Sequence, residues 1–251
     1  MASFLSNNKS ILTVMLQCEE PDLAVKRIRN ALCTGGEAFG LQVESLKPEY
    51  HSEAVYKRIV DEAKGCPTYF TNYRFDHNTG KTDYELADEL LTMASSGATL
   101  CDIMGDMFDI QPDQVAVDHS AIKMQEDLIE KIHARGSEVL MSSHVMKFTS
   151  AERVLEIARE HIRRGADISK IVVSANSIEE EIENLRINNL LKEQLGAPFL
   201  FLSQGENSIH RRLCAKLGCC MTLCVYEHDA LSTIAQPLLS VAKEIRDNLG
   251  F

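Results

Sequence analysis

The sequence alternates eight times between a short apolar run and a longer stretch with helical periodicity. The apolar runs have the length of β-strands: Ile11–Leu16, Phe39–Val43, Thr68–Tyr73, Thr99–Met104, Glu138–Ser142, Lys170–Ser174, Pro198–Ser203 and Cys220–Val225. The intervals carry apolar residues at helical spacing, most clearly over Ala121–Ala134, over Ala151–Arg163 and from Ile178 onward. Strands that alternate with helices predict a parallel sheet covered by helices.

Signals for helix ends accompany this alternation. Thr149 with Glu152, and Ser177 with Glu180, fit the capping box that opens a helix. Seven glycines stand ahead of strands, where helices are expected to stop: Gly36, Gly65, Gly97, Gly136, Gly165, Gly196 and Gly218. Eight repeats in 251 residues fit a closed barrel better than an open doubly wound sheet. We therefore predict one α/β domain over residues 1–251, a single (β/α)8 TIM barrel.

The composition narrows the class of partner. A formal net charge of −11 disfavours nucleic acid and anionic membranes, because both would repel this surface. No apolar stretch approaches the ~18 residues that a membrane span needs, and the first ten residues lack the features of a signal peptide. We therefore expect a cytoplasmic protein whose partner is a small molecule.

Most of the cysteines, histidines and clustered acidic residues are expected to be structural. The eight cysteines lie scattered, without paired motifs at zinc-ligand spacing, which predicts buried reduced thiols and no metal site. Four histidines fall in polar loops or helix starts: His77, His119, His210 and His228. Four glutamates are expected to form a solvated helix face: Glu179, Glu180, Glu181 and Glu183.

Candidate reactive groups stand at the ends of predicted strands, where barrel enzymes carry their active sites. Lys170 lies in the apolar run ISKIVVSA, where desolvation would lower its pKa as a nucleophilic amine requires. The alternative is a structural ion pair, or a lysine whose amine reaches solvent. His144 ends the neighbouring strand and could share a substrate with Lys170, and Arg74 follows the third strand. The polar connection Gly105–Ser120 lies on the same face, as a lid, a subunit contact or a plain surface loop.

The run VLMSSHVMKFTSAERV, followed by ISKIVVSANS, resembles the type I 3-dehydroquinate dehydratases, the Schiff-base dehydratases of the shikimate and quinate pathways. The matching motifs keep their order and spacing from ILTVMLQ to the last helix. The resemblance implies a (β/α)8 barrel, commonly a homodimer, that needs no metal or organic cofactor. It also implies lyase activity, the elimination of water from 3-dehydroquinate to give 3-dehydroshikimate.

The resemblance implies catalytic roles for two residues. Lys170 matches the lysine that attacks the substrate ketone and becomes an iminium, which acidifies the neighbouring C–H bond. His144 matches the general base that removes this proton and then, as an acid, helps the hydroxyl leave as water.

Substrate-binding roles follow from the same resemblance. Arg74 matches the family's arginine after the third strand. Arg212 matches the arginine that grips the substrate carboxylate, and a shift of one residue in the alignment would put Arg211 in its place. Ser232 and Gln236 match the serine and glutamine that would hold the same carboxylate end and the adjacent hydroxyl.

The sequence departs from the family pattern at four single positions, and also in the segment SQGENS and in the loop before Ser232. Gln42 and Glu44 stand where the family has Glu-x-Arg, Asn78 stands where it has a glutamate, and Met104 replaces the second carboxylate of Asp-x-Glu. We expect Gln42 and Glu44 to contact the substrate. The reversed charge at Glu44 is expected to change the set of polar groups that binds the ring hydroxyls of the substrate.

These departures keep two enzyme interpretations open. One is a divergent 3-dehydroquinate dehydratase, and the other is a relative that uses the same iminium chemistry on another hydroxylated cyclic keto acid. A barrel that binds a carboxylated metabolite without turnover is the non-enzyme alternative. A Schiff-base aldolase would also keep the lysine, but His144 and the Ser232–Gln236 pair favour the dehydratase.

Overall fold

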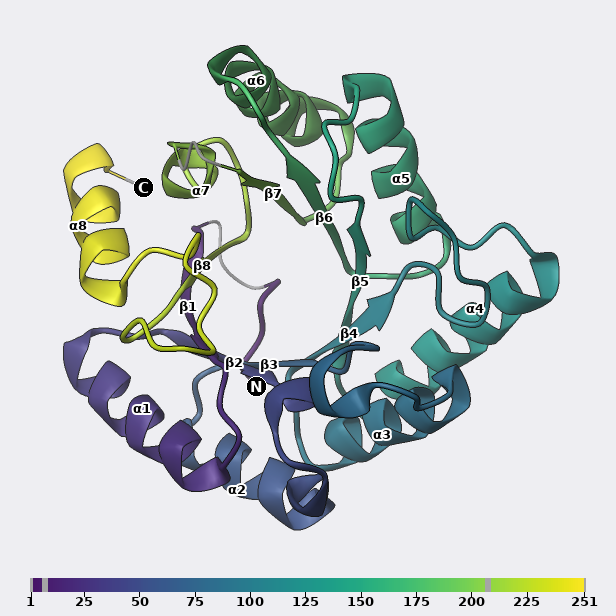
Figure 1. Ribbon diagram of the computed structural model, residues 1–251, viewed down its shortest axis with the longest axis vertical. Helices are drawn as coiled ribbons and strands as arrows, with labels where there is room; N and C mark the ends of the chain where they lie inside the picture. The colour runs from purple at the N-terminus through teal and green to yellow at the C-terminus, as the bar shows by residue number, and fades with distance from the viewer. Residues whose placement is uncertain (1, 6–8, 206–208, 251) are drawn as a thin grey trace.

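The computed structural model of the protein describes residues 2–5, 9–205 and 209–250, which form a barrel of eight parallel strands (Figure 1). Neighbouring strands pair in the order β7-β6-β5-β4-β3-β2-β1-β8. The strands are β1 (Ile11–Leu16), β2 (Ala38–Gln42), β3 (Thr68–Thr71), β4 (Leu100–Met104), β5 (Glu138–His144), β6 (Ile168–Ser174), β7 (Phe199–Gln204) and β8 (Met221–Cys224). The predicted (β/α)8 barrel is confirmed.

Helices surround the strands as an outer ring (Figure 1). They are α1 (Pro21–Thr34), α2 (Glu53–Glu62), α3 (Asp83–Ser95), α4 (His119–His133), α5 (Ala151–Arg163), α6 (Ile178–Gln194), α7 (Ile209–Leu213) and α8 (Leu239–Leu249). Three short 3-10 turns are η1 (Val43–Ser45), η2 (Pro48–Tyr50) and η3 (Asp76–Asn78). Among the described residues, no helix has the length and apolar character of a membrane span.

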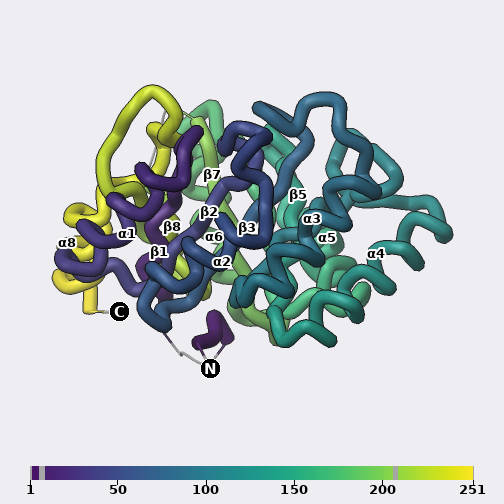
Figure 2. Tube along the Cα trace, turned by 90° about the horizontal axis from the view of Figure 1, so that it is seen from below, coloured from purple at the N-terminus to yellow at the C-terminus, as the bar shows by residue number. Residues whose placement is uncertain are grey.

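Two further contacts close the barrel, one between β7 and β8 and one at the amino ends of the strands. β7 meets β8 through a hydrogen bond from the backbone N–H of Cys220 to the carbonyl of Phe199 (2.9 Å). At the amino ends of the strands, Phe4 is buried and its N–H donates to the Glu138 carboxylate (2.9 Å). Figure 2 shows this N-terminal segment at the opposite end of the barrel from the loop between β8 and α8. The carboxyl ends of the strands are therefore the end left open for a ligand.

Two buried apolar clusters form the core. One packs α1 to α4 against the strands and includes Leu16 and Phe70. The other joins strand residues to α5 and α6 and includes Val154 and Ile187. Charged side chains on these strands therefore lie in apolar surroundings, where burial is unfavourable unless each charge is paired and hydrogen-bonded.

β5 and β6 bring together the two reactive residues predicted from the sequence. β5 runs two residues beyond its predicted end and includes His144, and β6 begins at Ile168, before the predicted start at Lys170. The register pairs Ser142 with Lys170 and His144 with Val172. The prediction that these two strands are neighbours is confirmed.

Two of the predicted helix ends are confirmed in part. Ser177 caps α6, because its Oγ accepts a hydrogen bond from the N–H of Glu180 (3.2 Å). The Glu180 carboxylate accepts in return from the N–H of Asn176 (2.6 Å), so the reciprocal bond falls one residue earlier than a capping box requires. α1 ends on Gly35 rather than the predicted Gly36, and Gly35 adopts the left-handed conformation (φ 97°) that suits glycine.

The predicted capping box at the start of α5 is wrong. Ser150, not Thr149, caps this helix, and its Oγ accepts from the N–H of Arg153 (3.4 Å). The Thr149 hydroxyl donates instead to the carbonyl of Lys147 (3.1 Å), which turns it back toward the preceding loop.

Two residues expected at the surface are buried. The Glu181 carboxylate accepts hydrogen bonds from the Ser203 hydroxyl (2.9 Å) and from the N–H of His210 (2.8 Å). His210 packs edge-on against the ring of Phe201. The charge pattern of the helix could not reveal this, because the partners of Glu181 come from β7 and α7.

The cysteines are all free thiols, as predicted. Burial holds for five of them: Cys18, Cys101, Cys214, Cys219 and Cys224. Cys33 is exposed, and Cys66 and Cys220 are partly exposed, so the prediction of burial was wrong for these three.

We expect Ser177→Ala to lower the free energy of unfolding by about 1 kcal/mol, because the N–H of Glu180 loses its capping acceptor. Thermal denaturation should show a decrease in Tm of roughly 2–4 °C for a chain of this size. Ser240→Ala is the control, since Ser240 is exposed in the first turn of α8. Equal Tm values for the two variants would contradict the capping assignment.

Candidate active site

A cavity of about 550 Å³ opens at the carboxyl ends of the strands. Five of the predicted site residues line it: Gln42, Arg74, His144, Lys170 and Gln236. The other three predicted site residues, Glu44, Arg212 and Ser232, lie outside the wall that the described residues form. The volume is in the usual range for a small-molecule site.

Lys170 is held in the wall by three polar contacts. Its side chain is 6% exposed. The Nζ atom lies 2.5 Å from the hydroxyl oxygen of Tyr73, 2.9 Å from that of Tyr69 and 3.2 Å from Oδ2 of Asp102. An ammonium group has three protons, so each proton has an acceptor.

Asp102 is the centre of this hydrogen-bond network. Its Oδ1 accepts from the Ser142 hydroxyl (2.5 Å), and its Oδ2 accepts from the hydroxyls of Tyr73 (2.5 Å) and Tyr69. Tyr69, Asp102, Ser142 and Lys170 come from the adjacent strands β3, β4, β5 and β6. A buried ion pair is tolerated when its remaining polar atoms are also hydrogen-bonded, and this network meets that condition.

The surroundings of Lys170 make its ammonium group easier to deprotonate than that of an ordinary lysine. Burial lowers its pKa below the ordinary value for lysine, and the carboxylate of Asp102 opposes this effect. A neutral amine is the nucleophilic form. The ion pair that the sequence suggested as a structural alternative is present, but its lysine lies in the cavity wall, and Asp102 behind it can accept the proton that Lys170 must lose.

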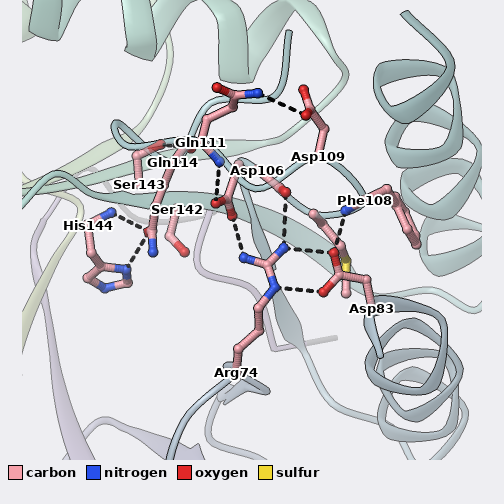
Figure 3. Close-up of polar contacts among 12 residues, drawn as sticks. Arg74, Asp83, Asp106, Phe108, Asp109, Gln111, Gln114, Ser142, Ser143 and His144 are labelled. Atoms are coloured by element: carbon pink, nitrogen blue, oxygen red, sulfur yellow. Dashed lines mark hydrogen bonds and ion pairs between the residues drawn. The ribbon is translucent and has the colours of Figure 1, made fainter. Parts of the chain in front are cut away.

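His144 is oriented by Gln114. The Gln114 Oε1 accepts from the backbone N–H of His144 (2.6 Å) and lies 3.2 Å from Nδ1 of its ring (Figure 3). Because an amide oxygen can only accept, Nδ1 carries the proton and Nε2 keeps its lone pair. Burial holds the pKa of His144 well below its ordinary value, and the charges of Lys170 and Arg211 add to this effect. The imidazole is therefore a neutral base at pH 7.

The backbone of Gln114 is fixed in turn. It lies in the left-handed region (φ 49°), and its carbonyl accepts from the Ser143 hydroxyl (2.6 Å). Gly105 packs against this carbonyl so closely that a Cβ would come within 2.5 Å of the oxygen. The connection Gly105–Ser120 thus forms part of the cavity wall and holds the predicted base in place.

Arg74 is bound by two carboxylates. Its Nε and Nη2 donate to Asp83 (2.6 and 2.8 Å), and its Nη1 donates to Asp106 (2.8 Å), as Figure 3 shows. Asp83 also accepts from the N–H of Phe108 (2.6 Å), and Asp106 is buried. The charge of Arg74 is therefore balanced within the protein, and the residue joins α3 to the loop after β4.

Arg211, rather than the predicted Arg212, lies in the cavity wall. It is buried, and its Nε donates to the carbonyl of Ser203 (2.9 Å). Burial lowers its pKa to about 10, which leaves the guanidinium charged at neutral pH. The exchange corresponds to the one-residue shift that the sequence alignment left open.

The loop between β8 and α8 supplies Gln236 to the wall. The Gln236 Oε1 is buried without a hydrogen-bond partner among the described residues, so a ligand hydroxyl would satisfy it. Thr233 is held by Gln17, whose amide donates to its Oγ1 (2.7 Å) and accepts from its N–H (2.9 Å). The Ser232 hydroxyl is used within the loop, where it accepts from the N–H of Asp229 (2.7 Å).

Glu44 faces away from the cavity. It lies in η1 directly after β2, and its carboxylate accepts from the Thr71 hydroxyl (2.9 Å) and the N–H of Tyr73 (3.4 Å). Burial raises its pKa to about 7. The side chain of Glu44 therefore lies outside the cavity wall that the described residues form.

The other departures from the family pattern differ in their effect on the wall. Gln42 and Met104 line the cavity and change its surface directly. Asn78 is buried behind the wall, where its amide nitrogen donates to Asn72 (2.7 Å) and to the carbonyl of Tyr73 (2.9 Å).

The sequence analysis missed the partners of both reactive residues. In the sequence, Tyr69 and Tyr73 look like ordinary apolar residues of a strand. A signal was nevertheless present, because buried tyrosines need a partner for their hydroxyls and Lys170 was already expected in the same barrel. For Gln114 no such signal existed, since it lies in the middle of a polar loop.

Fold and site together define a class of protein, a (β/α)8 barrel with a buried lysine and a neutral histidine at its open end. Within this class, the chain belongs to the type I 3-dehydroquinase family, whose sequence profile matches residues 12–250. This membership confirms the resemblance found in the sequence. The family consists of carbon–oxygen lyases that dehydrate 3-dehydroquinate.

Individual relatives agree with the profile. The 3-dehydroquinate dehydratase of Alkaliphilus oremlandii is 32% identical over 94 residues, an alignment that covers 37% of each chain. The structure of 3-dehydroquinate dehydratase from Geobacillus kaustophilus matches with a TM-score of 0.81 at 15% identity, over 99% of this chain and 95% of that one. The enzyme from Aquifex aeolicus gives 0.73 at 20% identity, over 96% and 99%. At these identities the structural matches show the shared fold.

We expect Gln114→Ala to lower kcat for 3-dehydroquinate by about 10- to 100-fold with little change in KM, because the imidazole loses the acceptor that fixes its tautomer. Gln114→Glu tests the same contact through charge. A carboxylate beside Nδ1 raises the pKa of His144, so the acid limb of kcat/KM should move to higher pH. The ultraviolet absorbance of the conjugated product measures both effects. An acid limb that stays in place in Gln114→Glu would contradict the assignment.

Glu44 should make stability depend on pH. Its folded-state pKa of about 7 lies above the ordinary 4.5, so the folded protein keeps a proton that the unfolded chain loses first. Its contribution to the free energy of unfolding is therefore largest at acid pH and falls as pH rises from 4.5 to 7.

The neutral variant Glu44→Gln removes this dependence. As the pH rises from about 5 to about 8, the free energy of unfolding measured by urea denaturation should fall by about 2–3 kcal/mol more in wild type than in the variant. A difference between the two proteins that stays constant with pH would mean that Glu44 is ionised in the folded state at all these pH values.

Proposed function

We propose that the protein dehydrates 3-dehydroquinate to 3-dehydroshikimate through a Schiff base on Lys170. The single observation that supports this most is the buried amine of Lys170 in the cavity wall, where desolvation lowers its pKa. Family membership supplies the reaction, and the neutral imidazole of His144 in the same wall supplies the base.

The mechanism begins with the nitrogen lone pair of Lys170 attacking the ketone carbon, and loss of the ketone oxygen as water leaves an iminium. The cationic nitrogen draws electrons from the adjacent C–H bond, so its proton becomes acidic. Nε2 of His144 takes this proton and then gives it to the β-hydroxyl as the C–O bond breaks. Hydrolysis of the conjugated imine releases the product and restores the amine.

We assign the substrate carboxylate to Arg211. Its guanidinium is charged, buried and in the wall, and a carboxylate that enters this partly desolvated site is attracted more strongly than in water. Gln236 offers its unpartnered Oε1 to an adjacent substrate hydroxyl. Arg212 and Ser232 stay predicted carboxylate-binding residues, although they lie outside the wall here.

A second candidate is the same iminium chemistry on another hydroxylated cyclic keto acid. The observation that favours it is the composition of the wall. Arg74 is neutralised by two aspartates, and several amide side chains line the space: Gln42, Gln111, Gln114 and Gln204. Amides both donate and accept, so they can read a pattern of ring hydroxyls different from that of 3-dehydroquinate.

We further propose that the protein acts as a cytoplasmic homodimer. The free state of its eight cysteines fits a reducing compartment. The dimer rests on the family resemblance, and sedimentation would test it as a species of twice the 28.0 kDa chain mass.

We expect sodium borohydride to trap an adduct on Lys170 when it is added with 3-dehydroquinate, because reduction converts the imine into a stable amine. Intact-mass spectrometry would detect the adduct, and peptide mapping would locate it. Lys170→Met should give neither adduct nor turnover. Lys147→Met is the control, since Lys147 is exposed in the loop after β5 and should leave both unchanged.

The outcomes separate the interpretations. An adduct with turnover supports the dehydratase, and an adduct without turnover favours the other keto acid as substrate. Full activity in Lys170→Met, with no adduct in the wild type, would overturn the Schiff-base mechanism.

A further inference from the structure

Tyr73 holds a position that the mechanism above does not use. Its hydroxyl oxygen lies 2.5 Å from Nζ of Lys170 and 2.5 Å from Oδ2 of Asp102. Its ring lines the cavity, stacks on Phe75 and meets the ring of His144 edge-on, with centroids 5.0 Å apart. Tyr73 thus contacts the nitrogen that attacks the substrate and also faces the space in which the substrate binds.

Imine formation poses a proton-transfer problem at this nitrogen. In the resting site, Lys170 has three acceptors and is held as an ammonium ion, which has no free lone pair. When an ammonium ion and a ketone become an iminium and water, two protons move from the nitrogen to the ketone oxygen. Because Nζ is buried, a protein group in contact with it is better placed than bulk water to carry them.

We propose that Tyr73 is a further catalytic residue, which relays these two protons from Lys170 to the ketone oxygen of the substrate; this rests on the proposed Schiff-base mechanism. The ammonium first passes one proton through the Tyr73 hydroxyl to Asp102. The freed lone pair then forms the C–N bond, and the C=O π electrons move onto oxygen.

The remaining transfers restore the site. Tyr73 accepts a proton from the new C–N nitrogen while it gives its own to the oxygen, which yields a neutral carbinolamine. The proton held on Asp102 then returns through Tyr73 to the hydroxyl. The nitrogen lone pair forms the C=N bond, the C–O bond breaks and water leaves, so that Tyr73 is again a phenol and Asp102 a carboxylate.

The Tyr73 hydroxyl is protonated at rest, as a proton relay requires. Burial and the nearby charge of Asp102 raise its pKa well above the ordinary value for tyrosine, so a free phenolate is not populated. The hydroxyl can therefore accept one proton only as it gives up another. Its present contacts already have this arrangement, because Lys170 donates to the phenol oxygen and the phenol donates to Asp102.

Tyr69 provides a matched comparison within the same network. Its hydroxyl lies 2.9 Å from Nζ of Lys170 and also donates to Asp102. Its side chain is fully buried and does not belong to the wall that the described residues form. A hydroxyl that only adjusts the charge of Lys170 could come from either tyrosine. A hydroxyl that passes a proton to the substrate must belong to a residue of the cavity wall, and this wall includes Tyr73 but not Tyr69.

The test is a single-turnover measurement of imine formation, with enzyme in excess of 3-dehydroquinate and borohydride quenching at successive times. Tyr73→Phe keeps the ring and removes the hydroxyl, and it should slow the appearance of the Lys170 adduct by about 10²- to 10³-fold. Tyr69→Phe should slow it by less than about tenfold. Both variants should reach the wild-type yield of adduct on long incubation, because the lysine is intact.

A second pair of variants compares Tyr73 with Tyr69 without removing either hydroxyl, so that a folding defect does not decide the result. Tyr73→3,5-difluorotyrosine retains the hydroxyl and changes its acidity, so the rate of imine formation should change, whereas the same replacement at Tyr69 should have little effect. Equal effects at the two positions, or a wild-type rate in both Tyr73 variants, would overturn the relay alone. A wild-type protein that is never labelled would overturn the Schiff-base mechanism, and the relay with it.

Discussion

The buried ion pair between Lys170 and Asp102 is the interaction on which the rest of the site depends. An isolated ammonium inside an apolar barrel is unfavourable by several kcal/mol, and the protein tolerates it only with a carboxylate and further hydrogen bonds around it. Neighbouring strands supply these groups, and the parallel register places Ser142 directly opposite Lys170. The same burial that makes the pair costly brings the amine closer to the neutral form that attacks a ketone.

The second reactive residue depends on a different part of the fold. His144 ends β5, but its orientation comes from Gln114 in the long connection after β4. That connection is anchored by Arg74, which bridges Asp83 and Asp106, as Figure 3 shows. Because the group at Nδ1 is an amide and not a carboxylate, it fixes the tautomer of the imidazole without raising its pKa. The base therefore stays neutral beside a positively charged lysine.

Much of the fold could be predicted from the sequence, because eightfold alternation of strands and helices depends only on local periodicity. The barrel topology makes β5 and β6 neighbours, so Lys170 and His144 could be paired from the sequence alone. The contacts around them could not be predicted in the same way. Tyr73 lies 97 residues from Lys170 in the sequence, and nothing local in either segment indicates that their side chains meet.

The positions of two predicted site residues outside the cavity wall have equally physical causes. Arg211 and Arg212 are consecutive residues of the short helix α7, so their side chains point in different directions, and sequence alone leaves their order ambiguous. Glu44 follows β2 in a 3-10 turn, which directs its side chain toward Thr71 and away from the cavity. Side-chain direction after the end of a strand depends on such turns, whose geometry the apolar pattern does not encode.

The central claim is that the buried amine of Lys170 forms a covalent bond with the substrate. A crystal structure of the protein treated with 3-dehydroquinate and borohydride tests it most directly. The account predicts a carbon–nitrogen bond from Nζ of Lys170 to the former ketone carbon, with the hydroxyl of Tyr73 still in contact with that nitrogen. An occupied cavity in which Lys170 is unmodified and still paired with Asp102 would contradict it.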